Sequence, residues 1–180
     1  MGDIACGRRD ALRPWPSSGK NELIMQVEPW DSKAPGVVEL PSGRRVRGRG
    51  LRRGLPRGPV PTLAVHLTGR RPPQPAWERH WVRWIDFWVP SDFAAAQRVL
   101  RLAYTEAVTE RVEIACGGGV GRTGTALAAL AILDGMDPDD AVTWVRRHYH
   151  PRAVEVAWQR RFLSAVAVGP DGDARTDRSR

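Results

Sequence analysis

Short apolar runs alternate with longer stretches of helical spacing along this chain. Runs typical of strands occupy residues 22–27, 37–40, 45–47, 62–67, 80–85 and 112–116. Apolar residues at helical spacing occupy residues 92–109, 122–134, 137–149 and 155–166. Strands interleaved with helices, followed by helices to the end, predict an α/β fold with a central mixed sheet flanked by helices.

Polar residues, glycines and prolines mark where several of these elements begin and end. Residues 41–43 (Pro-Ser-Gly) predict a turn that joins two early strands as a hairpin. Asp92 stands just before a helical pattern, which is typical of an N-cap. Gly135 fits the position that follows a helix, and Pro138 fits the first position of the next one.

The chain has 180 residues, of which 42% are apolar, so one domain with a buried core is expected. Residues 1–22 are polar and lack periodicity, and we expect a disordered tail there. The domain is predicted to span residues 23–167, and residues 168–180 to form a mobile charged tail. No apolar run approaches the roughly 18 residues that cross a membrane, and no secretory signal pattern is visible, so no membrane association is expected.

The cysteines and histidines predict neither a disulfide framework nor a metal site. The chain has two cysteines, Cys6 and Cys116, which lie far apart in the sequence. A free thiol of this kind suits the reducing cytoplasm. The four histidines lack the spacing to cysteine partners that metal sites show, and we interpret His148 and His150 as helix-end capping and surface groups.

Arginine dominates the net charge of +8, because only Lys20 and Lys33 are lysines. Residues 40–77 contain nine arginines and no acidic residue, and seven of the arginines fall within residues 44–57. Two interpretations remain open: a positive rim that attracts a phosphorylated substrate, or a solvated arginine-rich loop. The stretch lacks interleaved aromatic residues that would stack on bases, which argues against nucleic acid as a partner.

One cysteine stands between a predicted strand and a predicted helix, at the start of a glycine-rich segment. The segment reads Cys116, Gly117, Gly118, Gly119, Val120, Gly121, Arg122, Thr123. Glycines let backbone N–H groups turn toward an anion, and the helix N-terminus adds further N–H groups. The same field stabilises a thiolate nucleophile, and Arg122 can bind two phosphate oxygens. The segment therefore predicts a phosphate-binding loop with a nucleophilic cysteine.

This segment resembles the signature of the cysteine-dependent protein tyrosine phosphatase superfamily, including its small actinobacterial-type members. Residues 119–124 match the tyrosine-specific branch letter for letter. The resemblance covers residues 62–162 and implies a phosphocysteine intermediate without metal or cofactor. It also implies that phosphate is bound by Gly117, Gly118, Gly119, Val120, Gly121 and Arg122. Thr123 matches the hydroxyl that assists the cysteine sulfur as a leaving group, although a threonine there can equally cap backbone groups.

Residues 84–90 (Trp-Ile-Asp-Phe-Trp-Val-Pro) resemble the acid loop of that family, Trp-Pro-Asp-x-Gly-Val-Pro. Asp86 falls on the position of the general acid. Protonation of a phenolate leaving group, whose conjugate acid has a pKa near 10, lowers the barrier to P–O cleavage. Ile85 and Trp88 depart from the family pattern. Asp92 is the rival carboxylate, but its position favours the N-cap.

Residues 153–163 resemble the glutamine-loop segment of the family, with Gln159 and Phe162 as matches. Gln159 is predicted to support the signature loop by binding its backbone groups. Glu155 stands where the family has a glutamine that positions water, so its role is open. Ala115 replaces the histidine that precedes the cysteine in the family, and we expect weaker activation of the thiol.

The leading hypothesis is a phosphomonoester hydrolase, first of all a protein tyrosine phosphatase. The absence of lysine at positions 117 and 120 argues against phosphoinositide substrates. A small phosphorylated metabolite or an RNA 5′-phosphate remains an alternative substrate. A phosphate-binding pseudophosphatase that acts as an interaction module is favoured by Ala115, Ile85 and Glu155. A rhodanese-like sulfurtransferase also uses a loop cysteine, but Thr123 argues against it. Dual specificity and oligomeric state stay open.

Overall fold

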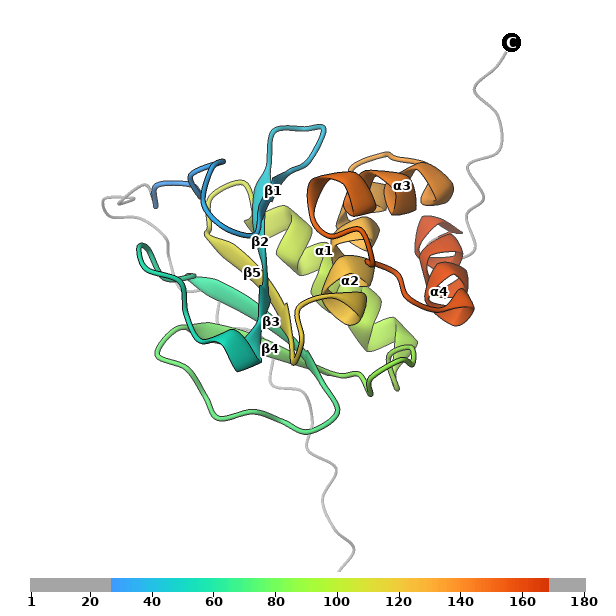
Figure 1. Ribbon diagram of the computed structural model, residues 1–180, viewed down its shortest axis with the longest axis horizontal. Coiled ribbons are helices and arrows are strands. Elements are labelled where there is room, and N and C mark those ends of the chain that lie inside the picture. The colour runs from blue at the N-terminus through green and yellow to red at the C-terminus, as the bar shows by residue number, and fades with distance from the viewer. Residues whose placement is uncertain (1–26, 169–180) are drawn as a thin grey trace, which may run out of the picture.

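Five strands form one sheet in the computed structural model, which describes residues 27–168 of the chain. The strands are β1 (Val37–Glu39), β2 (Arg45–Gly50), β3 (Leu63–Thr68), β4 (Glu78–Arg83) and β5 (Val112–Cys116). Their order is β1-β2-β5-β3-β4, with β1 antiparallel to β2 and the remaining pairs parallel. The expected mixed sheet is confirmed, and β5 lies in its middle (Figure 1).

The predicted tail at residues 1–22, residues 22–26 of the strand predicted at 22–27, and residues 169–180 of the other predicted tail lie outside the described residues, whereas Val168 ends α4. Val27, the last residue of that predicted strand, is not in a strand. The other strands were predicted correctly to within three residues, the largest difference being at the end of β2, and the early hairpin is confirmed by the β1–β2 pair. Because β2, β3, β4 and β5 run in the same direction, the segments that follow them leave from one edge of the sheet.

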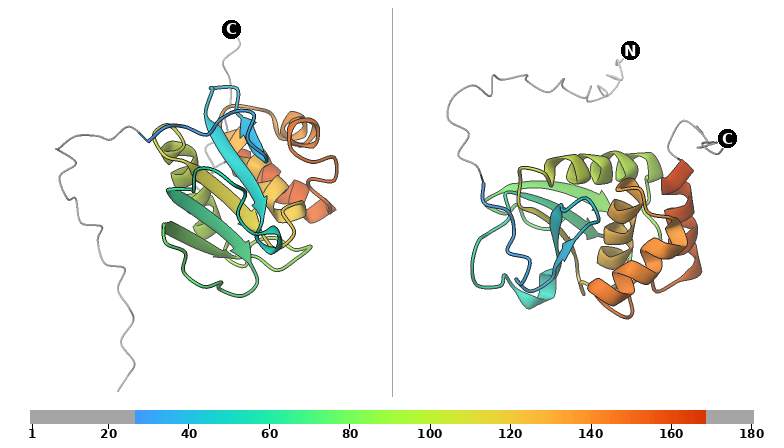
Figure 2. Two further views of the ribbon diagram at one scale, coloured as in Figure 1. Left: turned by 60° about the vertical axis from the view of Figure 1, so that its left-hand side comes forward. Right: turned by 90° about the horizontal axis from the view of Figure 1, so that it is seen from above.

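All four α-helices lie on one face of this sheet (Figure 2). They are α1 (Phe93–Glu106), α2 (Gly121–Leu133), α3 (Pro138–His148) and α4 (Ala157–Val168). Asp92 caps α1, as predicted, because its carboxylate accepts a hydrogen bond of 2.8 Å from the backbone N–H of Ala95. Gly135 follows α2 with a φ of 106°, which confirms its predicted role. The last helix begins at Ala157, two residues later than predicted.

The main core lies between the sheet and the helices. Val112, Ile114 and Cys116 alternate along β5 and face this core, which α2 fills with buried side chains on nearly every side. Trp84 closes the core near the end of β4 and packs against Phe162 of α4 at a ring-centroid distance of 5.2 Å. The core therefore holds the strand that ends in Cys116 against the helix that follows it.

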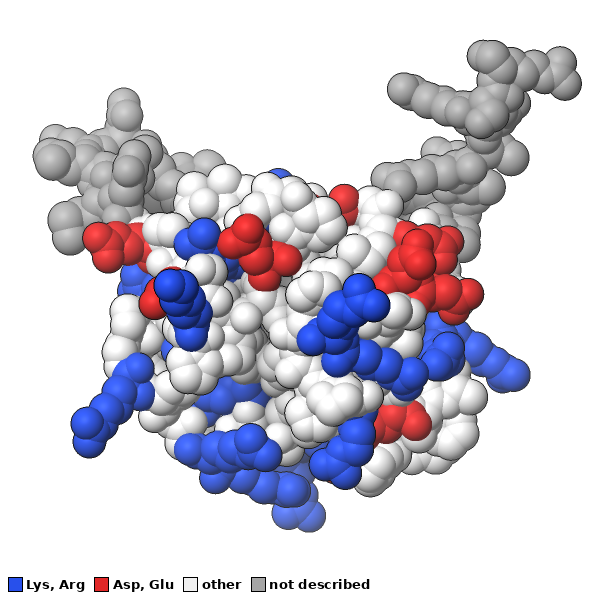
Figure 3. Space-filling view, turned by 45° about the horizontal axis from the view of Figure 1, so that its top comes forward, with Lys and Arg blue, Asp and Glu red and all other residues white. Residues whose placement is uncertain are grey.

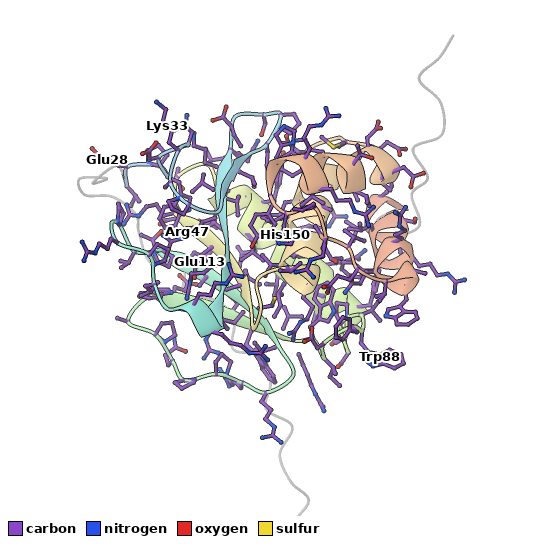
Figure 4. The ribbon with its side chains drawn as sticks, viewed as in Figure 1. Glu28, Lys33, Arg47, Trp88, Glu113 and His150 are labelled. Atoms are coloured by element: carbon purple, nitrogen blue, oxygen red, sulfur yellow. The ribbon has the colours of Figure 1, made fainter. Side chains whose placement is uncertain are left out.

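The opposite face of the sheet carries a buried ion cluster of Arg47, Arg49 and Glu113 (Figure 4). The Glu113 carboxylate lies 2.7–2.9 Å from guanidinium nitrogens of both arginines. Arg47 also lies over the ring of Trp30 at 3.9 Å, and burial lowers its pKa although Glu113 opposes that shift. Neither open interpretation of the arginine-rich stretch describes these two residues, because both are paired inside the protein.

His66 lies on the same face and is almost completely buried. Burial lowers the pKa of this imidazole to about 4, although the charge of Glu113 acts in the other direction. The folded protein therefore holds His66 in its neutral form at pH 7. Between residues 27 and 168, no helix is long and apolar enough to cross a membrane.

Candidate active site

The signature loop, residues 116–122, connects the end of β5 to the start of α2. Cys116 is 2% exposed, and its Sγ accepts a hydrogen bond of 3.1 Å from the backbone N–H of Gly119. Val120, the residue before α2, gives no side-chain cap, so the first turn of α2 keeps N–H groups that can bind an anion.

Glycines let the signature loop pack directly on the end of β2. Gly119 has a φ of 76°, and a Cβ on it would lie 2.4 Å from the backbone nitrogen of Gly50. A Cβ on Gly50 would lie 2.7 Å from the carbonyl oxygen of Gly118. Larger residues at Gly50 and Gly119 would therefore separate the loop from the strand.

Arg122 connects the signature loop to the acid loop, residues 84–90. Its Nη1 donates to the carbonyl of Trp84 at 2.9 Å, and its Nη2 lies 3.0 Å from Oδ1 of Asp86. Its Nε is buried and has no hydrogen-bond partner among the described residues. The edge formed by Nε and Nη2 is the one with which a guanidinium binds two oxygens of a phosphate side by side.

Asp86 and Asp92 occupy different environments. The Asp86 side chain is 52% exposed and points to Arg122, whereas Asp92 caps α1. The acid loop is folded on itself, because Trp88 donates its backbone N–H to the carbonyl of Ile85 at 3.2 Å. The structure thus brings Asp86, and not Asp92, to the arginine that begins α2.

The first helical turn of α4 holds the acid loop. The indole N–H of Trp158 donates to the carbonyl of Phe87, and its ring stacks on Trp88 with centroids 5.7 Å apart. Figure 4 shows Trp88 beside the lower end of α4. Phe87 and Trp88 are 54% and 59% exposed. Sequence reasoning missed this role of Trp158, since nothing local to it indicates a partner in another loop.

Comparisons with known proteins agree with this arrangement. A family model described as "Swiss Army Knife protein, DSP-PTPase phosphatase domain" matches residues 85–166. Over these residues the chain is similar to the phosphatase domains of the cysteine-dependent protein tyrosine phosphatase superfamily. The solved structure titled "Crystal structure of Tk-PTP in the active form" has a TM-score of 0.57 and 23% identity, and the match covers 74% of this chain and 97% of that one.

The structure titled "Crystal structure of Tk-PTP in the G95A mutant form" has a TM-score of 0.51 and 25% identity. That match covers 58% of this chain and 75% of the other. No curated protein sequence matches the chain. The solved structures support the phosphatase fold, and the region matched by the family model includes Asp86 and the signature loop.

Two predicted support residues lie before and at the start of α4. Gln159 accepts a hydrogen bond of 2.8 Å from the backbone N–H of Glu155, so the predicted binding to the signature loop is wrong. The reason is that Gln159 stands in the first turn of α4, where side-chain oxygens serve nearby N–H groups. The Glu155 carboxylate lies against Gly121, whose Cβ would be 1.7 Å from Oε2. The N-terminus of α2 favours a negative charge there.

Thr123 is completely buried in α2 and faces the end of β2. Its hydroxyl lies 3.5 Å from the carbonyl oxygen of Arg49, and within the described part of the chain it makes no hydrogen bond to Cys116. The Thr123 hydroxyl therefore contacts the backbone of β2, which is neither of its two expected roles, and assistance to the Cys116 sulfur stays a prediction.

Two contacts on the signature loop were not found from the sequence. The Tyr149 hydroxyl donates to the carbonyl of Gly119 at 2.6 Å, and burial raises the pKa of this phenol well above its ordinary value. Arg52, in the short 3₁₀ helix η1 (Leu51–Arg53), donates its backbone N–H to the carbonyl of Gly117 at 3.2 Å. Over residues 27–168, no group of three or more histidine, cysteine or acidic side chains is arranged to hold a metal ion.

Proposed function

We propose that this phosphatase domain hydrolyses phosphomonoesters through a phosphocysteine intermediate and that phosphotyrosine in a protein is its substrate. The observation that carries the proposal is the contact of 3.0 Å between Asp86 and Arg122, which joins a candidate acid to the arginine of the loop that begins at Cys116. The family match supports phosphatase activity, and the residue roles below rest on the geometry.

In the first step the Cys116 thiolate attacks phosphorus, and an S–P bond forms as the P–O bond breaks. Asp86 in its protonated form gives its proton to the leaving oxygen. Arg122 and the backbone N–H groups of residues 117–122 stabilise the negative charge on the three equatorial oxygens. Water then attacks the phosphocysteine, gives a proton to the Asp86 carboxylate and releases phosphate together with the thiolate.

The ion pair between Asp86 and Arg122 must open during this cycle. A phosphate that binds the Nε–Nη2 edge of Arg122 takes the place of the carboxylate, because both anions need the same donors. Asp86, which is half exposed, is then available for the leaving group. Substrate binding and acid positioning are therefore linked through one guanidinium.

Aromatic side chains around the acid support an aryl leaving group. Phe87 and Trp88 follow Asp86 directly and expose more than half of their surface. Exposed aromatic rings can stack on the ring of a phosphotyrosine that approaches the acid. This arrangement favours phosphotyrosine over small aliphatic phosphomonoesters.

Leaving-group dependence tests the proposal. Asp86→Asn should slow hydrolysis of phosphotyrosine by about 10²–10⁴-fold. The rate with 4-nitrophenyl phosphate should fall much less, because its leaving group needs less protonation. Asp92→Asn is the matched control, because asparagine also caps a helix, and it should keep wild-type rates with both substrates. Cys116→Ser should abolish turnover and retain vanadate binding.

Two results would reject the assignment. If Asp86→Asn lowered the rate of hydrolysis of both substrates by the same factor, Asp86 would not be the general acid. Steady-state turnover by Cys116→Ser would remove the phosphocysteine intermediate.

A further inference from the structure

A second arginine reaches the signature loop from η1, directly after β2. The Nε and Cζ atoms of Arg52 lie 3.6 Å from the position that a Cβ on Gly117 would occupy, and Nη2 of Arg122 lies 3.6 Å from the same point. The two guanidinium groups therefore border one residue of the loop and are at most about 7 Å apart. The proposed reaction needs one arginine to bind the phosphate, which is Arg122, so it gives Arg52 no role.

The backbone that carries Arg52 is fixed to the signature loop. Its N–H donates to the carbonyl of Gly117, and the preceding Gly50 packs on Gly118 and Gly119 without room for a Cβ. The strand before it is anchored by the buried pair of Arg49 and Glu113. Arg52 thus starts from a defined position beside the loop, although its side chain is exposed.

The arginines of β2 and of the turn before it are neutralised by carboxylates, whereas Arg52, like Arg53 and Arg57, has no carboxylate partner among residues 27–168. Arg44 pairs with Asp134, Arg45 with Glu39, and Arg47 and Arg49 with Glu113. Among residues 27–168, no carboxylate lies within ion-pair distance of Arg52, and its side chain makes no hydrogen bond. Figure 3 shows lysine and arginine side chains gathered along the lower edge of one face of the molecule.

We propose that Arg52 forms a second anion-binding position beside the scissile phosphate, so that the preferred substrate carries a second phosphate on the neighbouring position. This inference rests on the proposed phosphomonoester hydrolysis and not on phosphotyrosine as the substrate, because a phosphotyrosine ring carries a single phosphate. Arg122 and the loop N–H groups hold the phosphate that is hydrolysed, and Arg52 holds the adjacent one, which stays on the substrate. Two phosphates on adjacent atoms of one ring fit two guanidinium groups that are at most about 7 Å apart.

A pair of isomers with the same charge tests this inference. In 1,2-phenylene bisphosphate the two phosphates are adjacent, whereas in 1,4-phenylene bisphosphate the ring separates them. The wild-type protein should hydrolyse the 1,2 isomer with a kcat/KM at least about tenfold higher, the size expected for one charge-assisted contact. Phenyl phosphate, with a single phosphate, should behave as the 1,4 isomer does.

Arg52→Gln should remove the preference for the 1,2 isomer and leave phenyl phosphate hydrolysis within about threefold of wild type. Arg57→Gln removes an exposed arginine from the same segment and should keep the preference. Equal rates for the two isomers in the wild type would overturn the inference. So would an equal loss of phenyl phosphate and 1,2-bisphosphate hydrolysis in Arg52→Gln, because Arg52 would then bind the scissile phosphate itself.

A second experiment asks whether the second phosphate belongs to a protein or to a small molecule. It compares the rate of hydrolysis of a peptide that carries two adjacent phosphotyrosines with the rate for the same peptide carrying one. A preference for the peptide that Arg52→Gln removes would assign the second phosphate to a protein. A preference confined to the ring compound would assign it to a small molecule. If the proposed function itself were wrong, the wild-type protein would hydrolyse none of these compounds, phenyl phosphate included. That result differs from every outcome that overturns the inference about Arg52.

Discussion

The buried carboxylate of Glu113 offers a quantitative test of how burial changes the loss of stability when one partner of an ion pair is removed. Its two oxygens lie 2.7–2.9 Å from nitrogens of Arg47 and Arg49, and its side chain has no exposed surface. Glu113→Gln keeps the shape but leaves two guanidinium groups inside the protein without a counter-charge. Removing one partner of a buried ion pair destabilises proteins by about 3–5 kcal/mol, and we expect a loss of that size.

Glu39→Gln is the matched control on the neighbouring part of the same sheet. Glu39 pairs with Arg45 at 2.8 Å, a similar distance, but the two side chains are 49% and 34% exposed. Solvent already screens this pair, so its loss should change the free energy of unfolding by about 0–1 kcal/mol. The two variants therefore differ in burial and in the number of arginines that lose their partner, two for Glu113 and one for Glu39.

Urea unfolding at pH 7, followed by circular dichroism, measures both free energies. Glu113→Gln should lower the unfolding midpoint strongly, and Glu39→Gln should leave it close to that of the wild type. A difference between the two variants of less than about 1 kcal/mol would refute the argument, because burial would then add nothing to the cost of an unpaired arginine.

Three further predictions follow from other contacts. The pKa of His66 is lowered to about 4 in the folded protein, so between about pH 6.5 and 4 the unfolded chain takes up a proton that the folded protein does not. The free energy of unfolding should therefore fall by about 3 kcal/mol between pH 6.5 and 4. Urea midpoints of His66→Gln should show a shallower fall over the same range. Trp158→Phe loses the N–H that binds the carbonyl of Phe87, and should lower kcat for phenyl phosphate more than for 4-nitrophenyl phosphate; equal losses would count against a role in positioning the acid. Gly119→Ala should lower stability by at least about 2 kcal/mol in thermal melts, whereas Gly118→Ala, with nothing near its Cβ, should not.

Local patterns in the sequence were sufficient for the signature segment and for the ends of the helices. Cys116 ends β5 and Arg122 stands in the first turn of α2, as the strand–glycine–helix order predicts. Asp92 and Gly135 occupy the helix-end positions expected from their residue types. These features depend on neighbours a few residues away, which is the distance over which a single sequence is informative.

Contacts between distant segments could not be derived in the same way. Arg47 meets Glu113 across 66 residues, and the sequence shows the arginine only within a run of like charges. The period of two in Arg45, Arg47 and Arg49 does indicate one common face of a strand, a signal that could have been used. Which acidic residue pairs with these arginines depends on which strands become neighbours in the sheet. Neither the period nor the composition of the sequence determines that strand order.

The central place of β5 has a consequence for how the protein folds. β5 pairs with β2 and β3, and contacts across these pairs join residues 66 and 49 positions apart. Each such pairing closes a long loop of chain, which is slow in proteins of high contact order. The β1–β2 hairpin is local, but Cys116 reaches its surroundings only when β5 has joined β2 to β3. Recovery of activity during refolding is thus expected to coincide with the last, global phase and to follow the hairpin.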